Sequence, residues 1–406
     1  MGEPRGRGPI LVAAAGFPPT ITGSAVLNRN LWGAWPADDV VAVSVRLPGA
    51  RVDPGLALPG VPVTLVEPWP FRRPRVAAQL DPFAAGAVAR VVADVARRTQ
   101  ARAIWANWPN TPFLIGAWRA ARELRLPLYV HLHDTWREAY AARPLPLERL
   151  AAWWYEGRLL RAARRLFTIT DAAREHYLRS LGLDSTVLPH CVPAADLDRP
   201  PPAARPVGTR RVLHFAGHVY RAMNTDALAM LARALPLCRH DVILHCYTPS
   251  SAAPLAAAGI AGDRVEVRFG TRDEVMADQA AADLLVLPLA FRSPNPLEIR
   301  TVFPTKLLEY FVSGRPVLVH APFDSWCARD AGAKGWAAVV DEPSPAALAR
   351  AIDALLDDAP RQASLVAAAR AEARRRAAPD VARALRAELE EIGVILSGPP
   401  TDAGTR

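Results

Sequence analysis

The sequence predicts an α/β fold made of two doubly wound, Rossmann-like parallel-sheet domains. Short apolar runs alternate with amphipathic stretches along nearly all of the 406 residues. The runs carry apolar residues at successive positions, as do strands of a parallel sheet that is covered by helices on both faces. The alternation stops at a proline-rich stretch near residue 200 and then begins again. We therefore expect two domains of ordinary size rather than one.

The first domain is predicted over residues 1–195. Its strands and helices follow one another in the order expected of βαβ units. The predicted strands are 10–16, 40–46, 103–107, 128–133, 166–170 and 186–189. The predicted helices are 82–98, 113–124, 147–164 and 171–181.

A linker is predicted over residues 196–210, which show no periodicity and are rich in proline. The second domain follows over 211–378, and its pattern again predicts a parallel sheet. Its predicted strands are 212–217, 242–247, 265–270, 284–289, 316–320 and 338–341. Its predicted helices are 224–235, 273–281, 304–312, 345–357 and 364–376, before a terminal helix at 379–396 and a disordered tail at 397–406.

Composition argues against several classes of function. The net charge of +9 suits a nucleic-acid binder, but 49 basic residues face 40 acidic ones and arginine is spread along the whole chain. The four cysteines form no C-x-x-C pair and lie in or beside apolar runs, which indicates buried, reduced thiols. No stretch approaches the length of a membrane span, and the first apolar run is too short for a signal sequence. We expect a soluble, cytoplasmic protein that does not bind nucleic acid.

Residues 303–320 carry the most information about function. Pro304 suits the first turn of a helix, and Gly314 suits its end. Lys306 and Glu309 are three positions apart, so they share a helix face near the N-terminus, where backbone N–H groups favour an anion. This pattern predicts a site for a nucleoside diphosphate, with the phosphates beside Lys306 and the ribose hydroxyls on Glu309.

The segment resembles the nucleotide-sugar-binding core of retaining GT-B glycosyltransferases of the glycosyltransferase family 4 type. In that family a ribose-binding glutamate precedes a small-Gly-x-Pro-Val sequence. The matching residues here are Glu309, Ser313, Gly314, Pro316 and Val317. A second glutamate often lies eight positions earlier, where this chain has Thr301, and Glu298 lies three residues further upstream. Thr305 and Lys306 complete the Pro-x-Lys variant of the motif.

The resemblance implies further donor contacts in the second domain. Gly217 ends a predicted strand, and ligands of open α/β sheets collect beyond the carboxyl ends of strands. Arg221 matches a residue that contacts donor phosphate, and Asn224 is the expected N-cap of the next helix. Phe269 and Gly270 match a loop that embraces the base. For Arg221 the alternative is a plain surface arginine. For Phe269 and Gly270 the alternative is an ordinary strand end.

The loop 292–300 is expected to line the sugar site, with Glu298 either on sugar hydroxyls or facing solvent. In the first domain, Gly23 and Ser24 match a tight turn where backbone approaches the donor phosphate; a simple turn would explain them equally. Strand alternation puts His131 and His133 on one side of a strand that ends beside Asp134. The resemblance implies that His133 and Asp134 lie near the acceptor, for binding or proton transfer. His131 is expected in a core position.

The stretch 153–165 combines Trp153 and Trp154 with several arginines, including Arg158 and Arg161. Such a helix suits an anionic membrane that carries lipid-linked acceptors. The alternative, which we favour from sequence, is a packing helix whose arginines are solvated.

Together, the resemblance implies a GT-B enzyme with its active site in an interdomain cleft and a last helix that crosses back to the first domain. It would transfer a hexosyl or other glycosyl group with retention, from a nucleotide sugar such as a UDP- or GDP-sugar. The acceptor hydroxyl would belong to a glycan, a lipid-linked saccharide or a small molecule, as in cell-envelope polysaccharide biosynthesis at the inner membrane. No cofactor or metal is expected, because the resemblance implies a metal-independent reaction in which Arg221 and Lys306 stabilise the leaving diphosphate.

Two alternatives stay open. Another GT-B enzyme, such as a nucleotide-sugar epimerase or an inverting transferase, would share most of these features. The second alternative is a catalytically inactive sugar-nucleotide binder that serves as a partner protein. It stays open because Thr301 replaces the usual glutamate.

Overall fold

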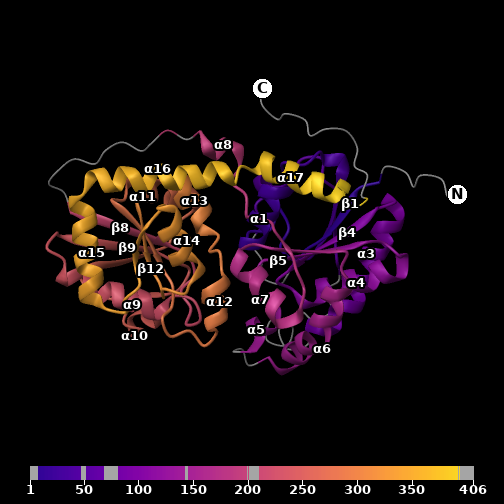
Figure 1. Cartoon of the computed structure of the whole chain (residues 1–406), viewed down its shortest axis with the longest axis horizontal. Helices are drawn as coiled ribbons and strands as arrows, with labels where there is room; N and C mark the ends of the chain where they lie inside the picture. Colours follow the sequence, from indigo (N-terminus) through magenta and orange to yellow (C-terminus); the bar gives the residue numbers. More distant parts are fainter. Residues whose placement is uncertain are drawn as a thin grey trace. The chain divides into compact units, whose positions relative to one another are not determined.

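A computed structural model of the chain describes residues 8–46, 52–67, 81–141, 145–198, 200, 210–391 and 393. They form two compact units, each around its own parallel sheet (Figure 1). The first unit draws on Met1–Pro193 and Arg376–Arg406, and the second on Ala194–Arg375. The predicted fold class, two Rossmann-like α/β halves, is confirmed.

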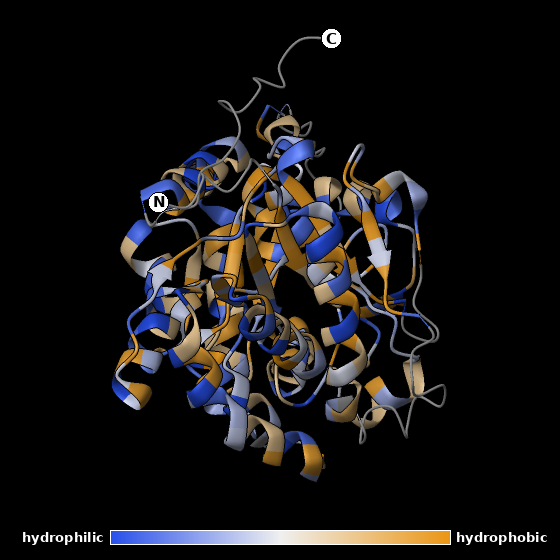
Figure 2. Cartoon of the chain, turned by 90° about the vertical axis from the view of Figure 1, so that its right-hand side faces the viewer, coloured by the Kyte–Doolittle hydropathy of each residue, from blue (hydrophilic) through white to orange (hydrophobic). Residues whose placement is uncertain are grey.

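The first unit contains a seven-stranded sheet in the order β3-β2-β1-β4-β5-β6-β7. All of its pairings are parallel. The strands are β1 (Ile10–Ala13), β2 (Val40–Ser44), β3 (Val63–Leu65), β4 (Ala103–Trp108), β5 (Leu128–Leu132), β6 (Arg165–Thr168) and β7 (Thr186–Val187). The central strands are fully buried, and Figure 2 shows them in the hydrophobic colour among helices that carry both colours.

Helices cover this sheet and include one from the far end of the chain. They are α1 (Gly23–Trp32), α3 (Ala85–Thr99), α4 (Thr111–Leu124), α5 (Trp136–Ala141), α6 (Pro146–Ala162), α7 (Asp171–Leu181) and α17 (Ala378–Glu391). Val381, Leu385 and Leu389 of α17 are buried in the same apolar cluster as Trp32 and Trp105. The carboxyl-terminal helix is therefore part of the first unit's core.

The second unit contains a six-stranded parallel sheet in the order β10-β9-β8-β11-β12-β13. Its strands are β8 (Arg211–Ala216), β9 (Val242–Tyr247), β10 (Val265–Arg268), β11 (Leu284–Pro288), β12 (Val317–His320) and β13 (Ala338–Val340). Its helices are α8 (Ala194–Leu197), α9 (Thr225–Ala234), α10 (Ala252–Ala257), α11 (Arg272–Ala281), α12 (Pro296–Thr301), α13 (Lys306–Val312), α14 (Trp326–Lys334), α15 (Pro345–Asp357) and α16 (Ala359–Arg375).

The strand order of each sheet reverses beside its first strand. In the second unit the chain runs outward from β8 through β9 to β10, then returns to place β11 on the other side of β8. Such a switch point leaves a crevice at the carboxyl ends of the two central strands, where ligands of open α/β sheets bind. The loop that follows β8 therefore lies where a ligand would bind.

Local sequence explains where many helices begin and end. The side chains of Asn110, Thr170 and Ser344 each accept a hydrogen bond from a backbone N–H in the first turn of α4, α7 and α15. Gly182 ends α7 with a left-handed φ of 68°. These caps satisfy backbone groups that the helix itself leaves open.

Several predicted boundaries were wrong. The helix expected from Pro304 begins at Lys306, because Pro304 and Thr305 form a tight turn in which the Leu307 N–H donates to the Pro304 carbonyl over 2.9 Å. The expected loop at 292–300 contains α12, which Asn295 caps. The expected linker at 196–210 overlaps α8, and its remaining part, like the tail at 397–406, lies largely or wholly outside the described residues.

Candidate functional site

Gly217 lies directly after β8, at the switch point of the second sheet. Its φ is 143°, a conformation that side-chain-bearing residues rarely adopt, and its N–H donates to the Tyr247 carbonyl over 2.9 Å. A Cβ atom built on Gly217 would lie only 2.9 Å from Nζ of Lys306. The glycine thus leaves the space that the lysine amine occupies.

Lys306 is the first residue of α13, and its amine is held close to an aromatic ring. Nζ lies 3.9 Å from the ring centroid of Phe215, within range of a cation–π interaction. Burial lowers the pKa of Lys306 to about 7, although Cys246 and Glu309 act in the opposite direction. No ion pair reaches this amine from the described part of the chain. The site therefore holds a partly desolvated amine. A bound anion would favour its protonated form and would balance its positive charge.

Glu309 lies one turn further along α13 and is about one-third exposed. Its carboxylate Oε1 is 3.2 Å from Nη2 of Arg272, and its backbone carbonyl accepts a hydrogen bond of 3.2 Å from the Gln279 side chain. Both partners belong to α11. The position of this carboxylate therefore depends on how α11 is anchored.

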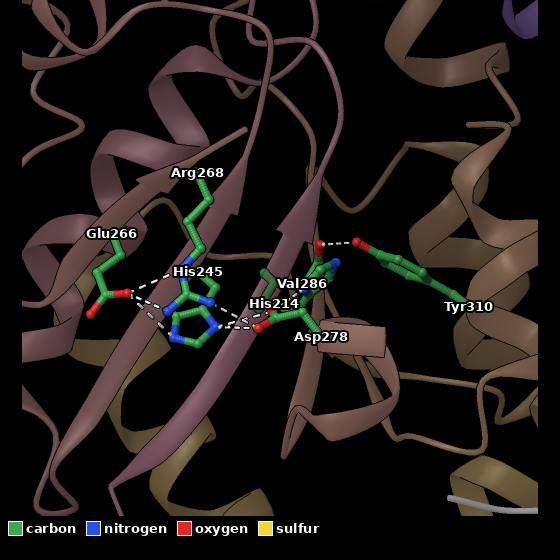
Figure 3. A network of polar contacts seen from close by, with 7 residues as sticks. All are labelled: His214, His245, Glu266, Arg268, Asp278, Val286 and Tyr310. Carbon is green, nitrogen blue, oxygen red and sulfur yellow. Dashed lines mark hydrogen bonds and ion pairs between the residues drawn. The ribbon is translucent and has the colours of Figure 1, made fainter. Parts of the chain in front are cut away.

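A polar network anchors α11 to the sheet (Figure 3). Asp278 accepts hydrogen bonds of 2.9 Å from His214 on β8, from His245 on β9 and from Arg268 on β10. Although burial raises it, these histidine contacts hold the pKa of Asp278 well below its usual range. Glu266 pairs with Arg268 from the other side. His214, His245 and Glu266 are in register across three strands. Because the one buried residue of α11 is the polar Gln279, polar contacts rather than apolar burial hold this helix in place.

Arg221 lies in the loop after Gly217 and is exposed. Asn224 is the N-cap residue of α9, as expected, but its side chain makes no capping hydrogen bond. Instead it accepts from the Tyr220 N–H over 3.1 Å and donates to the His218 carbonyl over 3.0 Å. Asn224 thus orders the loop that carries Arg221. Thr305, also exposed, precedes α13 without capping it.

Phe269 and Gly270 follow β10 and lead into α11. Phe269 is 67% exposed. A Cβ on Gly270 would lie 3.0 Å from Oε2 of Glu274 and 3.2 Å from the Tyr247 ring, so the glycine permits a close turn. Thr271 and Glu274 then form a capping box that starts α11.

Glu298 and Thr301 both belong to α12. Glu298 Oε2 accepts from the Asn295 side chain over 3.1 Å, and its N–H donates to Asn295 Oδ1 over 3.3 Å. Thr301 is buried, and its hydroxyl donates to the Leu297 carbonyl over 2.9 Å. Thr301 is thus part of the packed interior of this unit.

In the first unit, Gly23 and Ser24 are the first two residues of α1. The Thr22 hydroxyl caps this helix by accepting from the Ala25 N–H over 3.1 Å. A Cβ on Gly16 would lie 2.7 Å from Cβ of Ser24. It is therefore Gly16, rather than Gly23, that allows the loop after β1 to approach the start of α1.

His133 lies just beyond the end of β5, in a cluster of three buried histidines. Its Nε2 is 3.2 Å from Nδ1 of His131, and its ring centroid is 5.2 Å from that of His190. Burial lowers the pKa of His133 to about 4 and holds those of His131 and His190 well below their ordinary value. All three are therefore neutral near pH 7. Asp134, next in the chain, is half-buried.

The histidines line a small pocket. Leu27, Leu31, Asn28, Pro189 and Cys191 complete its lining. Nδ1 of His133 is buried and meets no hydrogen-bond partner among the described residues. Sequence reasoning missed His190, because a single histidine after a two-residue strand gives no periodic signal.

The structure thus brings Lys306 against Gly217, with Glu309 one turn away, and brings His133 together with His131. The described side chains include no group of three His, Cys, Asp or Glu residues arranged to hold a metal ion. None of the helices in the described ranges has the length and apolar character needed to cross a membrane.

Comparisons with known proteins agree with this architecture. Residues 22–191 match the family model described as "Glycosyl transferase 4-like domain", and residues 210–358 match the one described as "Glycosyl transferases group 1". No curated protein sequence is significantly similar to the chain.

Three solved structures show the same fold over almost their whole length. HepE from Anabaena, in complex with UDP, is 17% identical with a TM-score of 0.65, covering 94% of this chain and 100% of its own. Sucrose-phosphate synthase from Thermosynechococcus elongatus is 15% identical with a TM-score of 0.67, covering 95% of this chain and 99% of its own. The α,α-trehalose-phosphate synthase (UDP-forming) from Burkholderia vietnamiensis is 16% identical with a TM-score of 0.62, covering 95% of this chain and 98% of its own. With both of its halves matched, the chain consists of a glycosyl transferase 4-like domain followed by a glycosyl transferases group 1 domain, and it has the fold of these three solved structures.

Proposed function

We propose that the protein transfers a sugar from a nucleoside-diphosphate sugar to an acceptor hydroxyl, with retention and without a metal ion. The observation that carries this proposal is the amine of Lys306 held against Gly217, one helical turn from the Glu309 carboxylate. A cation and a carboxylate at this spacing suit a diphosphate and a ribose of one ligand. UDP-sugars are the first candidates, since HepE and the trehalose-phosphate synthase are described with UDP.

Each donor residue has a role that its surroundings support. Lys306 and Arg221 would balance the charge that develops on the departing diphosphate, which is the main electrostatic requirement of the step. Lys306 takes up a proton on binding, because a diphosphate favours its charged form. Glu309 would accept hydrogen bonds from the ribose hydroxyls, with Arg272 holding the carboxylate in place until the donor arrives.

The first unit would supply the acceptor site. His133 is neutral and buried and has an Nδ1 without a partner among the described residues, so it can hydrogen-bond an acceptor hydroxyl. Its low pKa makes it a poor base near pH 7, so we assign acceptor deprotonation to an oxygen of the leaving phosphate. Asp134, and the start of α1 at Gly23 and Ser24, remain predictions for acceptor and phosphate contact. An acceptor that is a glycan, a lipid-linked saccharide or a small molecule would fit this proposal.

A thermal-shift screen of UDP-, GDP-, ADP- and dTDP-sugars tests the donor assignment. We expect one nucleotide to raise the melting temperature of the wild-type protein but not of Glu309→Gln. Product analysis by NMR with the selected donor then reports the anomeric configuration. Absence of stabilisation by every nucleotide would overturn the proposal. Conversion of the bare nucleotide sugar to its epimer without an acceptor would point to an epimerase, and donor binding without transfer to an inactive binder.

A further inference from the structure

The outer face of α6 is apolar where a surface helix is normally polar. Leu150, Trp153 and Trp154 are 59%, 61% and 49% exposed, and their spacing places them on one side of the helix. The opposite side is buried in the protein through Ala152, Leu159 and other residues. The packing interpretation favoured from sequence fits the buried face and the exposed arginines of α6, but the two tryptophans lie outside that packing.

The charges of α6 are separated between its two faces. Arg149, Arg158 and Arg161 are exposed, whereas Glu148 and Glu156 are only 2% and 3% exposed. The outer face thus carries cations and no carboxylate of its own. The Arg158 guanidinium lies 4.1 Å from the ring centroid of Trp154, so the cation and the aromatic ring form one unit.

We propose that this face binds the surface of an anionic phospholipid bilayer. Trp153, Trp154 and Leu150 would enter the interface between headgroups and acyl chains, where tryptophan is favoured because its ring is apolar and its N–H is polar. Arg158 and Arg161 would contact lipid phosphates, which the planar guanidinium group binds well. The inference uses no residue of the donor site and does not depend on the proposed function.

A lipid surface fits these residues better than a protein partner does. A stable protein interface buries roughly 800 Å² on each side and needs matching shapes, whereas the exposed apolar side chains of α6 form a single helical stripe. A bilayer adapts to such a stripe, and its anionic headgroups match the unopposed arginines. Exposed aromatic residues bordered by arginines, with no carboxylate on the same face of the helix, are therefore best explained by an anionic membrane surface.

Co-sedimentation of the full chain with vesicles tests the proposal. One set is pure phosphatidylcholine, and the other an equal mixture of phosphatidylcholine and phosphatidylglycerol. We expect binding to the anionic set only, with a partition coefficient at least tenfold lower for the double variant Trp153→Ser/Trp154→Ser. Arg158→Glu/Arg161→Glu should lower it by a similar factor, since each arginine near such a surface contributes about fivefold.

Matched controls separate surface effects from a general loss of apolar or charged groups. Phe323→Ser removes an aromatic residue that is 73% exposed on the other unit, and Arg383→Glu reverses an exposed charge on α17. Both should bind as the wild type does. Circular dichroism shows whether the tryptophan variant is folded. If it is not, the test uses the arginine variant alone. Equal partition of the wild type and the folded variants would overturn the proposal. So would light scattering that shows a wild-type dimer and a monomeric tryptophan variant, because the face would then bind protein.

Discussion

Nζ of Lys306 lies 2.9 Å from the point where a Cβ atom of residue 217 would be. The two residues are far apart in the sequence, one after β8 and the other at the start of α13. Gly217 meets two requirements together, a φ of 143° and space for the lysine amine. The proposed donor site is therefore built around the absence of a side chain.

Gly217→Ala should consequently impair transfer. The added methyl group would push the lysine amine aside, and misplacement of a catalytic group by about 1 Å can cost on the order of a hundredfold in rate. We also expect a loss of stability of about 1–3 kcal/mol from the strained φ. Gly332→Ala, in open space on α14, is the control and should leave kcat/KM unchanged. Wild-type kcat/KM for Gly217→Ala would rule out this role for the glycine.

Lys306 should make stability depend on pH. Its pKa is about 7 in the folded protein, against 10.5 for an ordinary exposed lysine. Between these values the unfolded chain binds the extra proton, so the Lys306 contribution to the free energy of unfolding rises with pH across this window. Below pH 7 the burial cost is present in full. We therefore expect Lys306→Met to be most stabilising, relative to wild type, below pH 7, while turnover is lost.

Chemical denaturation between pH 6 and 10 checks this prediction. The quantity to compare is the difference in the free energy of unfolding between wild type and Lys306→Met. Lys334→Met is the comparison, because Lys334 pairs with Asp330 and Glu372 and its loss should destabilise the protein near neutral pH. A pH-independent difference for Lys306→Met would contradict the lowered pKa.

Glu309→Gln should weaken donor binding by about 10- to 100-fold, the range expected for losing hydrogen bonds to a charged group. Titration calorimetry with the nucleotide found in the screen would measure it. Glu342→Gln, another exposed carboxylate in the same unit, should bind the donor normally. An unchanged dissociation constant for Glu309→Gln would remove the ribose assignment.

His133→Gln should reduce transfer about tenfold without changing donor affinity, because the acceptor would lose a hydrogen bond in a buried site and about 1.4 kcal/mol corresponds to a factor of ten in rate. It should also change acid stability. The pKa of His133 is about 4 in the folded protein, against 6.5 for an ordinary exposed histidine, so its contribution falls as pH drops from 6.5 towards 4. The variant should therefore unfold at lower pH than wild type. His218→Gln, at an exposed histidine, should leave the acid transition in place.

Asp278→Asn tests how α11 is held. Without this carboxylate, His214, His245 and Arg268 face one another with little compensation, and removal of one partner from such a network costs about 3 kcal/mol. Because α11 also holds Glu309 through Arg272, donor KM should rise by a larger factor than kcat falls. Asp273→Asn, exposed on the same helix, is the control. Loss of stability with normal donor KM would limit Asp278 to a structural role.

The sequence predicted most strands and long helices, because buried parallel strands and amphipathic helices have distinct periods. It missed β3, a short, half-buried edge strand, and α14, although Ser325 and Gly335 cap that helix at both ends. Asn224 is the N-cap residue that the sequence predicted, but its side chain bonds the preceding loop instead of the helix. Glu298 was left open between sugar and solvent, and the structure pairs it with Asn295.

The local order of residues was enough to identify two α/β halves, the Pro-x-Lys segment and a glutamate one turn beyond it, since each depends only on neighbours in the chain. The meeting of Gly217 with Lys306, the polar anchoring of α11, the inclusion of His190 beside His133 and the outward direction of Trp153 and Trp154 were decided by tertiary structure. All four join residues from separate strands and helices, or depend on which face of a helix the core covers. No periodic pattern within one segment can encode that choice.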